Sequence, residues 1–265
     1  MVQSTSSVAT LRLVLLIPVL AIVLASPAFA AVTIGNVTNK TAGGIFTHNN
    51  NGNLLILIGM RRSTLSYNVT GASYNGVPLS AVPSCRRENS SGASIIAYYL
   101  VNPPQGGHTI STTGGSGTPL IRTAVSVVGA NTTAPFGSCV TSAGHSTNAS
   151  VSLSSASGDL VLAATAKGYA TETVSAASPQ TQRWNVKSLG VSDDSPTTGV
   201  GSTEAGASSA AMSHNWSGTS RMWAMLGIPL RSTSSVSSPV TQRPTSPTPS
   251  GPTSTPIPTS TWSAP

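Results

Sequence analysis

The stretch of residues 93–113, ASIIAYYLVNPPQGGHTISTT, reads as a strand, a turn and a second strand. Residues 95–101 are rich in β-branched and aromatic side chains, which favour extended backbone. Residues 102–107 interrupt this run, because two prolines cannot donate to a β-ladder and two glycines adopt positive φ readily. Residues 109–113 are again β-branched, so the sequence predicts a β-hairpin near the middle of the chain.

Strand-like segments continue on both sides of this hairpin without any helical period. They comprise residues 31–37, 54–60, 67–74, 77–79, 121–128, 149–153, 160–166, 182–189, 210–216 and 222–230. The segments 49–53, 85–89 and 192–206 are predicted to be turns or loops. About ten strands with short loops predict an all-β fold, a two-sheet antiparallel β-sandwich or jelly roll. The expected core residues are Leu54, Ile56, Ile58, Ile96, Tyr98, Val125, Val127, Leu160, Leu162 and Trp223.

Two of these segments are alike: residues 52–61, GNLLILIGMR, align with residues 158–167, GDLVLAATAK. Each begins with glycine and a turn-forming residue, continues as an apolar run and ends in a basic residue. One interpretation is a weak internal duplication, with one central strand in each half. The other, which the sequence favours, is that any buried strand entered from a tight turn has this pattern. Both interpretations place the two segments in the core.

The two ends of the chain differ in composition from its middle. Residues 11–24 are apolar apart from Arg12, and residues 28–30, AFA, match a cleavage site. Residues 1–30 are therefore predicted to be a signal peptide, and the mature protein to be secreted or at the cell surface; an uncleaved anchor is the alternative. Residues 31–231 form the predicted β-domain. Residues 232–265 are nearly all Ser, Thr and Pro and are expected to be a disordered tail, either an O-glycosylated stalk or an unmodified segment.

Charged residues make up only 7% of the 265 residues, against about a quarter in an average protein. The polar surface must therefore be built from Ser, Thr, Asn and Gly. Without residues 1–30 the chain carries twelve basic and six acidic residues, a net charge of +6. The basic residues are scattered, which disfavours nucleic-acid binding, whereas weak attraction to acidic polysaccharide or an anionic cell surface fits this charge.

Cys85 and Cys139 are the cysteines of the chain, and in an oxidising compartment they are expected to form a disulfide. Two unpaired buried thiols are the alternative. Metal binding by the two cysteines alone is disfavoured, because a structural zinc site needs four ligands. N-glycosylation sequons are also present, and a few are expected to be occupied if the source organism glycosylates such sites. The sequon asparagines are Asn36, Asn39, Asn68, Asn89, Asn131, Asn148 and Asn215.

Catalytic motifs such as H-E-x-x-H, G-x-S-x-G and a Gly-rich phosphate loop are missing from the sequence. The six carboxylates form no evident glycosidase pair. The adjacent Asp193 and Asp194 are interpreted as a solvated loop, with a calcium site as the remote alternative. A Ser-His-Asp triad assembled from distant positions stays open as an alternative, because the chain is rich in serine. We predict no catalytic residue, no metal and no cofactor.

Aromatic side chains are the better binding candidates, because sugar-binding sandwiches stack pyranose rings on exposed aromatic rings. Trp184 and Tyr169 are the candidates for glycan stacking, with half-buried packing as the alternative for Trp184. The leading hypothesis is therefore a non-catalytic surface module that acts in adhesion or carbohydrate binding. A self-associating envelope or fibre component is the second hypothesis, and a secreted hydrolase is the third.

Three motifs mark turns and strands: YNGVPL at residues 74–79, IAYYLVNPPQG at residues 96–106 and MWA at residues 222–224. Through these three motifs the chain resembles a family of uncharacterised secreted modules of bacterial and archaeal surface proteins. The resemblance covers about residues 32–231. The resemblance implies a β-sandwich of extracellular or surface proteins. It implies no established catalytic residues, so no active site is carried over to this chain.

Overall fold

The computed structural model describes residues 31–41, 44–90, 92–115, 120–169, 172–188 and 196–233. In order, its elements are β1 (Thr33–Thr41), β2 (Phe46–Asn50), β3 (Leu54–Arg61), a 3-10 turn (Leu65–Tyr67), β4 (Val69–Tyr74), β5 (Val77–Pro78), β6 (Ser80–Asn89), β7 (Ala93–Val101), β8 (Gly106–Gly114), β9 (Leu120–Val128), β10 (Val140–Ser146), β11 (Asn148–Leu153), β12 (Leu160–Gly168), β13 (Val174–Ala176), β14 (Thr181–Ser188), β15 (Thr197–Ala205), β16 (Ala210–Trp216) and β17 (Arg221–Leu230). The predicted all-β class is confirmed. The predicted signal peptide, Asp193, Asp194 and all but two residues of the predicted tail lie outside the described residues.

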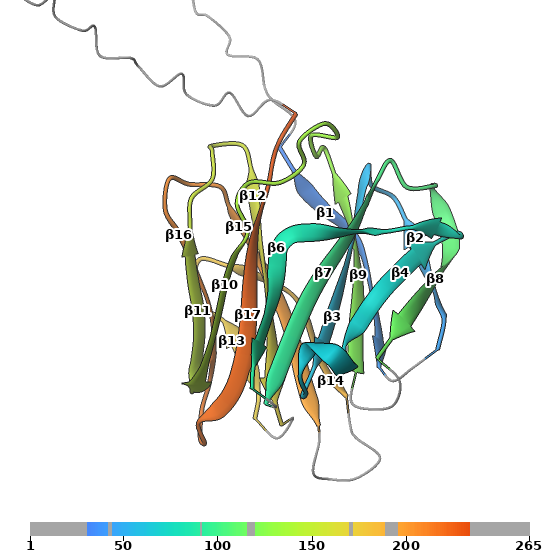
Figure 1. The fold of residues 1–265 in the computed structure, drawn as a ribbon. Helices are drawn as coiled ribbons and strands as arrows, with labels where there is room; N and C mark the ends of the chain where they lie inside the picture. The colour runs from blue at the N-terminus through green and yellow to red at the C-terminus, as the bar shows by residue number, and fades with distance from the viewer. Residues whose placement is uncertain are drawn as a thin grey trace, which may run out of the picture.

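The strands form four sheets that stack as four layers (Figure 1). Two inner sheets of five strands, in the orders β1-β9-β3-β7-β6 and β10-β17-β12-β15-β14, face each other across the central core. The sheet β2-β8-β4-β5 covers the outer face of the first inner sheet, and the sheet β11-β16-β13 covers that of the second. The predicted two-sheet sandwich is therefore correct for the centre, and each side carries one further sheet that the sequence does not predict.

The central strand β3 shows why the fold needs four layers. All eight of its residues are buried, and successive side chains of a strand point to opposite faces. Leu54, Ile56 and Ile58 therefore pack into the central core, whereas Leu55 and Leu57 pack into the layer under the first outer sheet. A continuous apolar run of this kind is stable only where both faces of the sheet are covered.

The predicted core is buried, although it is divided among the layers. Nine of the ten predicted residues are buried and Leu160 is half-buried. Ile96 and Tyr98 belong to the outer layer of the first half of the chain, and Trp223 belongs to that of the second half. The sequence therefore identified buried positions without identifying which pair of sheets encloses them.

Two segments predicted to be loops are strands instead. Residues 85–89 belong to β6, and residues 192–206 contain β15, whose first seven residues are buried. The sequence of β15, TTGVGSTEA, is small and polar, but its hydroxyls are hydrogen-bonded inside the protein. Ser202 Oγ, for example, lies 2.7 Å from Gln180 Oε1 and 2.9 Å from His214 Nε2. The prediction is wrong because these buried partners are distant in sequence.

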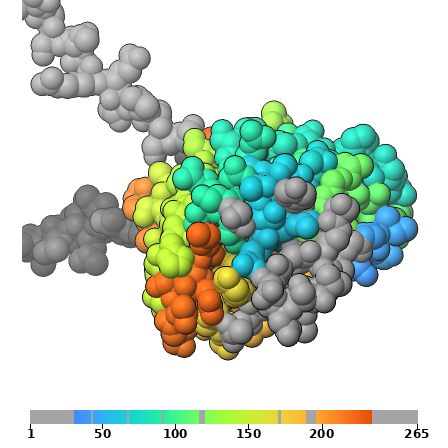
Figure 2. Space-filling model, turned by 60° about the horizontal axis from the view of Figure 1, so that its bottom comes forward, coloured from blue at the N-terminus to red at the C-terminus, as the bar shows by residue number. Residues whose placement is uncertain are grey.

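The two halves of the chain repeat one topology, and they lie side by side (Figure 2). The strands β1, β2, β3, β4, β6, β7, β8 and β9 correspond in order to β10 through β17, and among the described strands only β5 lacks a counterpart. With this correspondence the two inner sheets have the same strand order, and so do the two outer sheets.

Side-chain hydrogen bonds at the start of the central strands repeat as well. Asn53 Oδ1 accepts a hydrogen bond from Ala130 N in the first half, and Asp159 Oδ1 accepts one from Ser232 N in the second. These asparagine and aspartate positions follow the glycines of the two aligned segments. The aligned residues 52–61 and 158–167 therefore occupy equivalent places in a repeated topology, leading into and along the central strands β3 and β12. Both interpretations placed these segments in the core, and their burial confirms that placement.

Candidate binding groove

Residues 129–139 connect the two halves and cross one end of the molecule between β9 and β10. Three backbone hydrogen bonds attach this connection to the end of β17: Gly137 N to Pro229 O (2.9 Å), Arg231 N to Pro135 O (2.9 Å) and Asn131 N to Arg231 O (2.8 Å). The backbone N–H and C=O of Arg231 are therefore both hydrogen-bonded to the connection, which fixes the position of its Cα atom.

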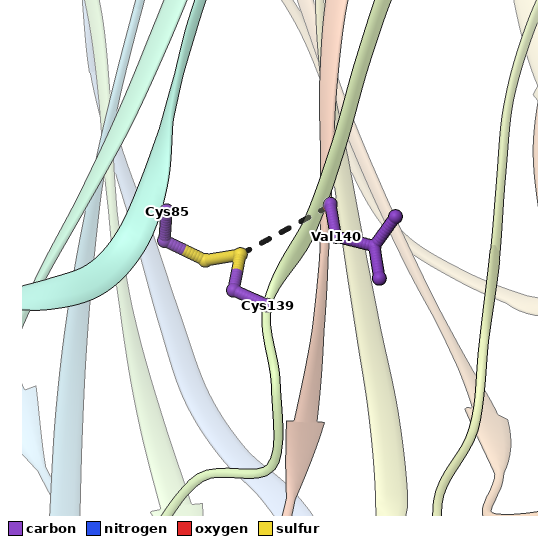
Figure 3. Close-up of a disulfide and its surroundings, with 3 residues drawn as sticks. All are labelled: Cys85, Cys139 and Val140. Atoms are coloured by element: carbon purple, nitrogen blue, oxygen red, sulfur yellow. Dashed lines mark hydrogen bonds between the residues drawn. A yellow bond between two sulfur atoms is a disulfide. The ribbon is translucent and has the colours of Figure 1, made fainter.

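The Cys85–Cys139 disulfide ties the connection to the first half (Figure 3). Cys85 is a buried residue of β6, and Cys139 immediately precedes β10. Their Cα atoms are 5.6 Å apart, which is a usual separation for a disulfide. The predicted disulfide is confirmed, and it crosslinks edge strands of the two inner sheets.

Cys85 lies in an extended bulge of β6. Pairing with β7 passes from Ala81↔Tyr98 directly to Arg86↔Ile96, so residues 82–85 lie outside the regular register. Ser84 within the bulge has a φ of 58°, in the left-handed region. The corresponding strand β14 has a narrower irregularity, in which only one residue is inserted between positions 182 and 184. The two copies of the repeated unit therefore differ at this place.

A hollow of about 470 Å³ opens between the bulge and the connection. Tyr99 of β7, Phe136 of the connection and Arg231 line it together with residues 82–84. The rings of Tyr99 and Phe136 meet edge to face, with centroids 4.9 Å apart and an interplanar angle of 85°. Both side chains are half-buried, so each ring is partly accessible.

A second hollow of about 790 Å³ adjoins the first, and Gly137, Ser138 and Arg231 line both. Hydroxyl and amide groups form part of the lining of the second hollow, from Asn131, Ser138, Ser152, Ser154, Ser155 and Ser208. Because they share three lining residues, the two hollows adjoin, and we call them together the junction groove. It is aromatic at one end and rich in hydroxyls at the other.

Trp184, the first predicted glycan-stacking residue, lies outside the junction groove. Its side chain is only 4% exposed, and its indole ring covers Gly201 of the neighbouring strand β15. A ring buried in the central core has no free face on which a sugar could stack. The prediction for Trp184 is therefore wrong, because the irregularity in β14 turns this side chain inward.

Replacing Gly201 with alanine is expected to lower the free energy of unfolding by about 2 kcal/mol. A Cβ atom at Gly201 would overlap the indole ring of Trp184, which the central core surrounds. Urea denaturation measures the change. Gly107→Ala is the control, because a Cβ atom there meets only Thr47 Cγ2, at 3.7 Å. Equal losses in both variants would contradict the packing described for Trp184.

Tyr169, the second predicted stacking residue, lies just beyond β12, at the end of that strand opposite to Asp159. Its ring is covered by two guanidinium groups, whose carbon atoms lie 4.0 Å (Arg62) and 4.4 Å (Arg221) from the ring centroid. Cation–π contacts of this kind use the electron-rich face that a sugar would need. The structure thus places Tyr169 in a packed cluster away from Trp184 and from the junction groove.

Two histidines lie beside serines in the buried layers. The ring nitrogens of His48 lie 2.9 Å from Thr38 Oγ1 and 2.9 Å from Ser126 Oγ. Burial lowers the pKa of His48 to about 4, so its ring is neutral at pH 7. A catalytic triad needs a carboxylate on the second ring nitrogen and an accessible serine. Here a second hydroxyl takes the place of the carboxylate and the ring is fully buried, so the contacts tie β2 to the inner sheet.

His214 likewise lies between two hydroxyl groups in the second half. Its ring nitrogens lie 2.7 Å from Thr165 Oγ1 and 2.9 Å from Ser202 Oγ, and burial lowers its pKa to about 4. These contacts tie β16 to the strands β12 and β15.

Within the described ranges, no three His, Cys, Asp or Glu side chains are grouped so that they could hold a metal ion. The same part of the chain contains no helix with the length and hydrophobicity of a membrane span.

Six of the seven sequon asparagines are exposed or half-buried, and Asn68 is the exception. Asn68 is fully buried, and its Nδ2 donates to Ser94 O (3.2 Å) and Ser94 Oγ (3.0 Å). A glycan on Asn68 would not fit this fold, so the prediction for Asn68 is wrong. Asn131 lines the junction groove, and Asn148 faces Asn215 across β11 and β16.

Sequence reasoning missed Tyr99, Phe136 and Arg231 as residues of one site. Tyr99 belongs to the opening hairpin, but its strand pattern gives no sign that its ring is partly accessible. The signal that was present is Cys139, because a disulfide to Cys85 brings β6 to the connection that contains Phe136.

Comparison of the chain with protein-family models, with curated proteins and with solved structures found no match.

Proposed function

We propose that this protein is a non-catalytic module of the cell surface or extracellular space that binds a carbohydrate chain in the junction groove. The observation that carries the proposal is the composition of that groove, with Tyr99 and Phe136 at one end and hydroxyl and amide groups at the other. Aromatic rings pack on the apolar faces of sugars, and hydroxyl and amide groups bond to sugar hydroxyls. An open groove with both kinds of group suits an extended chain of sugars.

The repeated topology supports this assignment, because the groove lies where the two halves differ. The extended bulge and Cys85 belong to the first half, and β14 has neither. Tyr99 pairs with Ile56 of β3, and Leu162 is the equivalent residue of β12. Leu162 pairs with Thr203, so Thr203 occupies the position of Tyr99 in the second half. A difference confined to one copy of a repeated unit is what a specialised binding site would produce.

An extracellular location is part of the proposal. The disulfide favours an oxidising compartment, where such bonds form and persist. The apolar segment and cleavage motif of residues 1–30 indicate secretion, and the shortage of charged residues fits a surface exposed to the exterior. Detection of mature protein outside the cell, beginning near residue 31, would support this location, whereas intact protein in the cytosol would contradict it.

Tyr99→Ala is expected to weaken carbohydrate binding about fivefold, because an aromatic contact to a sugar contributes roughly 1 kcal/mol. A glycan array identifies the ligand, and isothermal titration calorimetry measures its Kd. Tyr169→Ala serves as the control, since Tyr169 lies far from the groove, and circular dichroism verifies that both variants fold. Failure to bind any carbohydrate, or equal Kd values for Tyr99→Ala and the unaltered protein, would contradict the proposal.

Self-association in an envelope or fibre is the second candidate function. The outward-facing residues of the two outer sheets favour it, because they are uncharged and lie on opposite sides of the molecule (Figure 1). They are Thr47, Asn49, Thr109, Ser111 and Thr113 on one side, and Asn148, Ser150, Ser152, Ser213 and Asn215 on the other. Light scattering at high protein concentration tests this candidate, and a strictly monomeric mass would contradict it.

A further inference from the structure

Arg231 lies where the two hollows of the junction groove meet, and it lines both. Its backbone N and O are hydrogen-bonded to Pro135 O and Asn131 N, whereas the residue as a whole is exposed. The backbone of Arg231 is therefore fixed at the place where the two hollows adjoin, and the exposed residue lines both. A cation held in this way is available to a ligand that spans both hollows.

Among the described residues, Arg231 takes part in no ion pair. Among the residues that line the two hollows, the other charged one is Asp159. Asp159 is buried, and its two carboxylate oxygens accept hydrogen bonds from Ala156 N and Ser232 N, each at 3.0 Å. Glu172 forms ion pairs elsewhere in the molecule, with Lys167 and with Arg221.

A guanidinium group binds a carboxylate or a sulfate through two parallel charge-assisted hydrogen bonds, which a neutral sugar cannot supply. We propose that the junction groove selects a carbohydrate chain that carries anionic groups, with one such group bound by Arg231. This inference rests on the proposed carbohydrate binding and names its ligand class. The overall positive charge of the protein would draw such a polyanion toward it.

The test compares polygalacturonate with its methyl-esterified form, which has the same sugar backbone without the charge. Calorimetry with the full-length mature protein is expected to show at least about tenfold tighter binding of the acid form. Arg231→Gln is expected to remove this preference, and Arg231→Lys to keep only part of it, because lysine has the charge without the two-pronged geometry. Arg87→Gln is the matched control, an exposed arginine outside the groove, and should keep the full preference.

Each result decides between the inference and the function on which it rests. Equal binding of the acid and the ester would overturn the inference and leave carbohydrate binding in place. A preference for acid that persists in Arg231→Gln would overturn the role of Arg231. A stronger preference for a sulfated galactan that Arg231→Gln abolishes would support the inference with sulfate as the anionic group. Binding of no carbohydrate at all would contradict both the inference and the proposed function.

Discussion

Removal of the disulfide, by the double substitution Cys85→Ala and Cys139→Ala, is expected to lower the free energy of unfolding by about 4 kcal/mol. The two cysteines are separated by 54 residues. In the chain-entropy model, a crosslink of this length removes that much conformational freedom from the unfolded chain. The effect is large because a domain is stable by only about 5–15 kcal/mol in total.

The position of the disulfide adds a functional consequence to the loss of stability. Without it, the bulge of β6 and the connection are held together only by packing, so carbohydrate binding in the junction groove is expected to weaken as well. Urea denaturation with and without a reducing agent measures the effect. The double-alanine variant is the control, because reductant should leave its midpoint unchanged. An unaltered protein whose midpoint does not move on reduction would contradict the prediction.

Acidification from pH 7 to pH 4 is expected to lower the free energy of unfolding by about 6 kcal/mol through His48 and His214 together. Burial lowers the pKa of each to about 4 in the folded protein, against 6.5 for an ordinary histidine. Between these values the unfolded chain binds a proton at each site and the folded protein does not. Stability therefore falls as the pH falls below 6.5, by roughly 1.4 kcal/mol per pH unit and per histidine.

The acid effect is measured as a slope, from urea midpoints at a series of pH values between 7 and 4. His214→Gln is expected to reduce the contribution of the two histidines to this slope by about half, because one of the two buried groups no longer titrates. His145→Gln is the control, since His145 is exposed. A general destabilisation of the His214 variant does not affect the comparison of slopes. Identical slopes in all three proteins would contradict the assignment.

Local signals account for the parts of the fold that the sequence predicted. The opening hairpin is bounded by proline and glycine, and the strand from Leu54 is a continuous apolar run, so neighbouring residues define both. The pairing of Cys85 with Cys139 followed from their number and from the expected compartment. The strand β15 was missed because its Thr, Ser and Gly residues look like a loop until His214 and Gln180 are placed against Ser202.

The junction groove was not predictable because its parts come together only through the strand order. Tyr99, Phe136 and Arg231 are distant in sequence, and the register of β7, the disulfide and the pairing with the end of β17 bring them to one place. Trp184 was chosen from its polar neighbours, but a single inserted residue in β14 decided which way its ring points. The orientation of one side chain after a bulge depends on register, which composition does not encode.

The repeated architecture also makes the two halves depend on each other. Each half on its own would leave apolar side chains of its inner sheet, such as Ile56 in the first half or Leu162 in the second, facing water. Each inner sheet is therefore the cover of the other, and one half alone is not expected to fold stably.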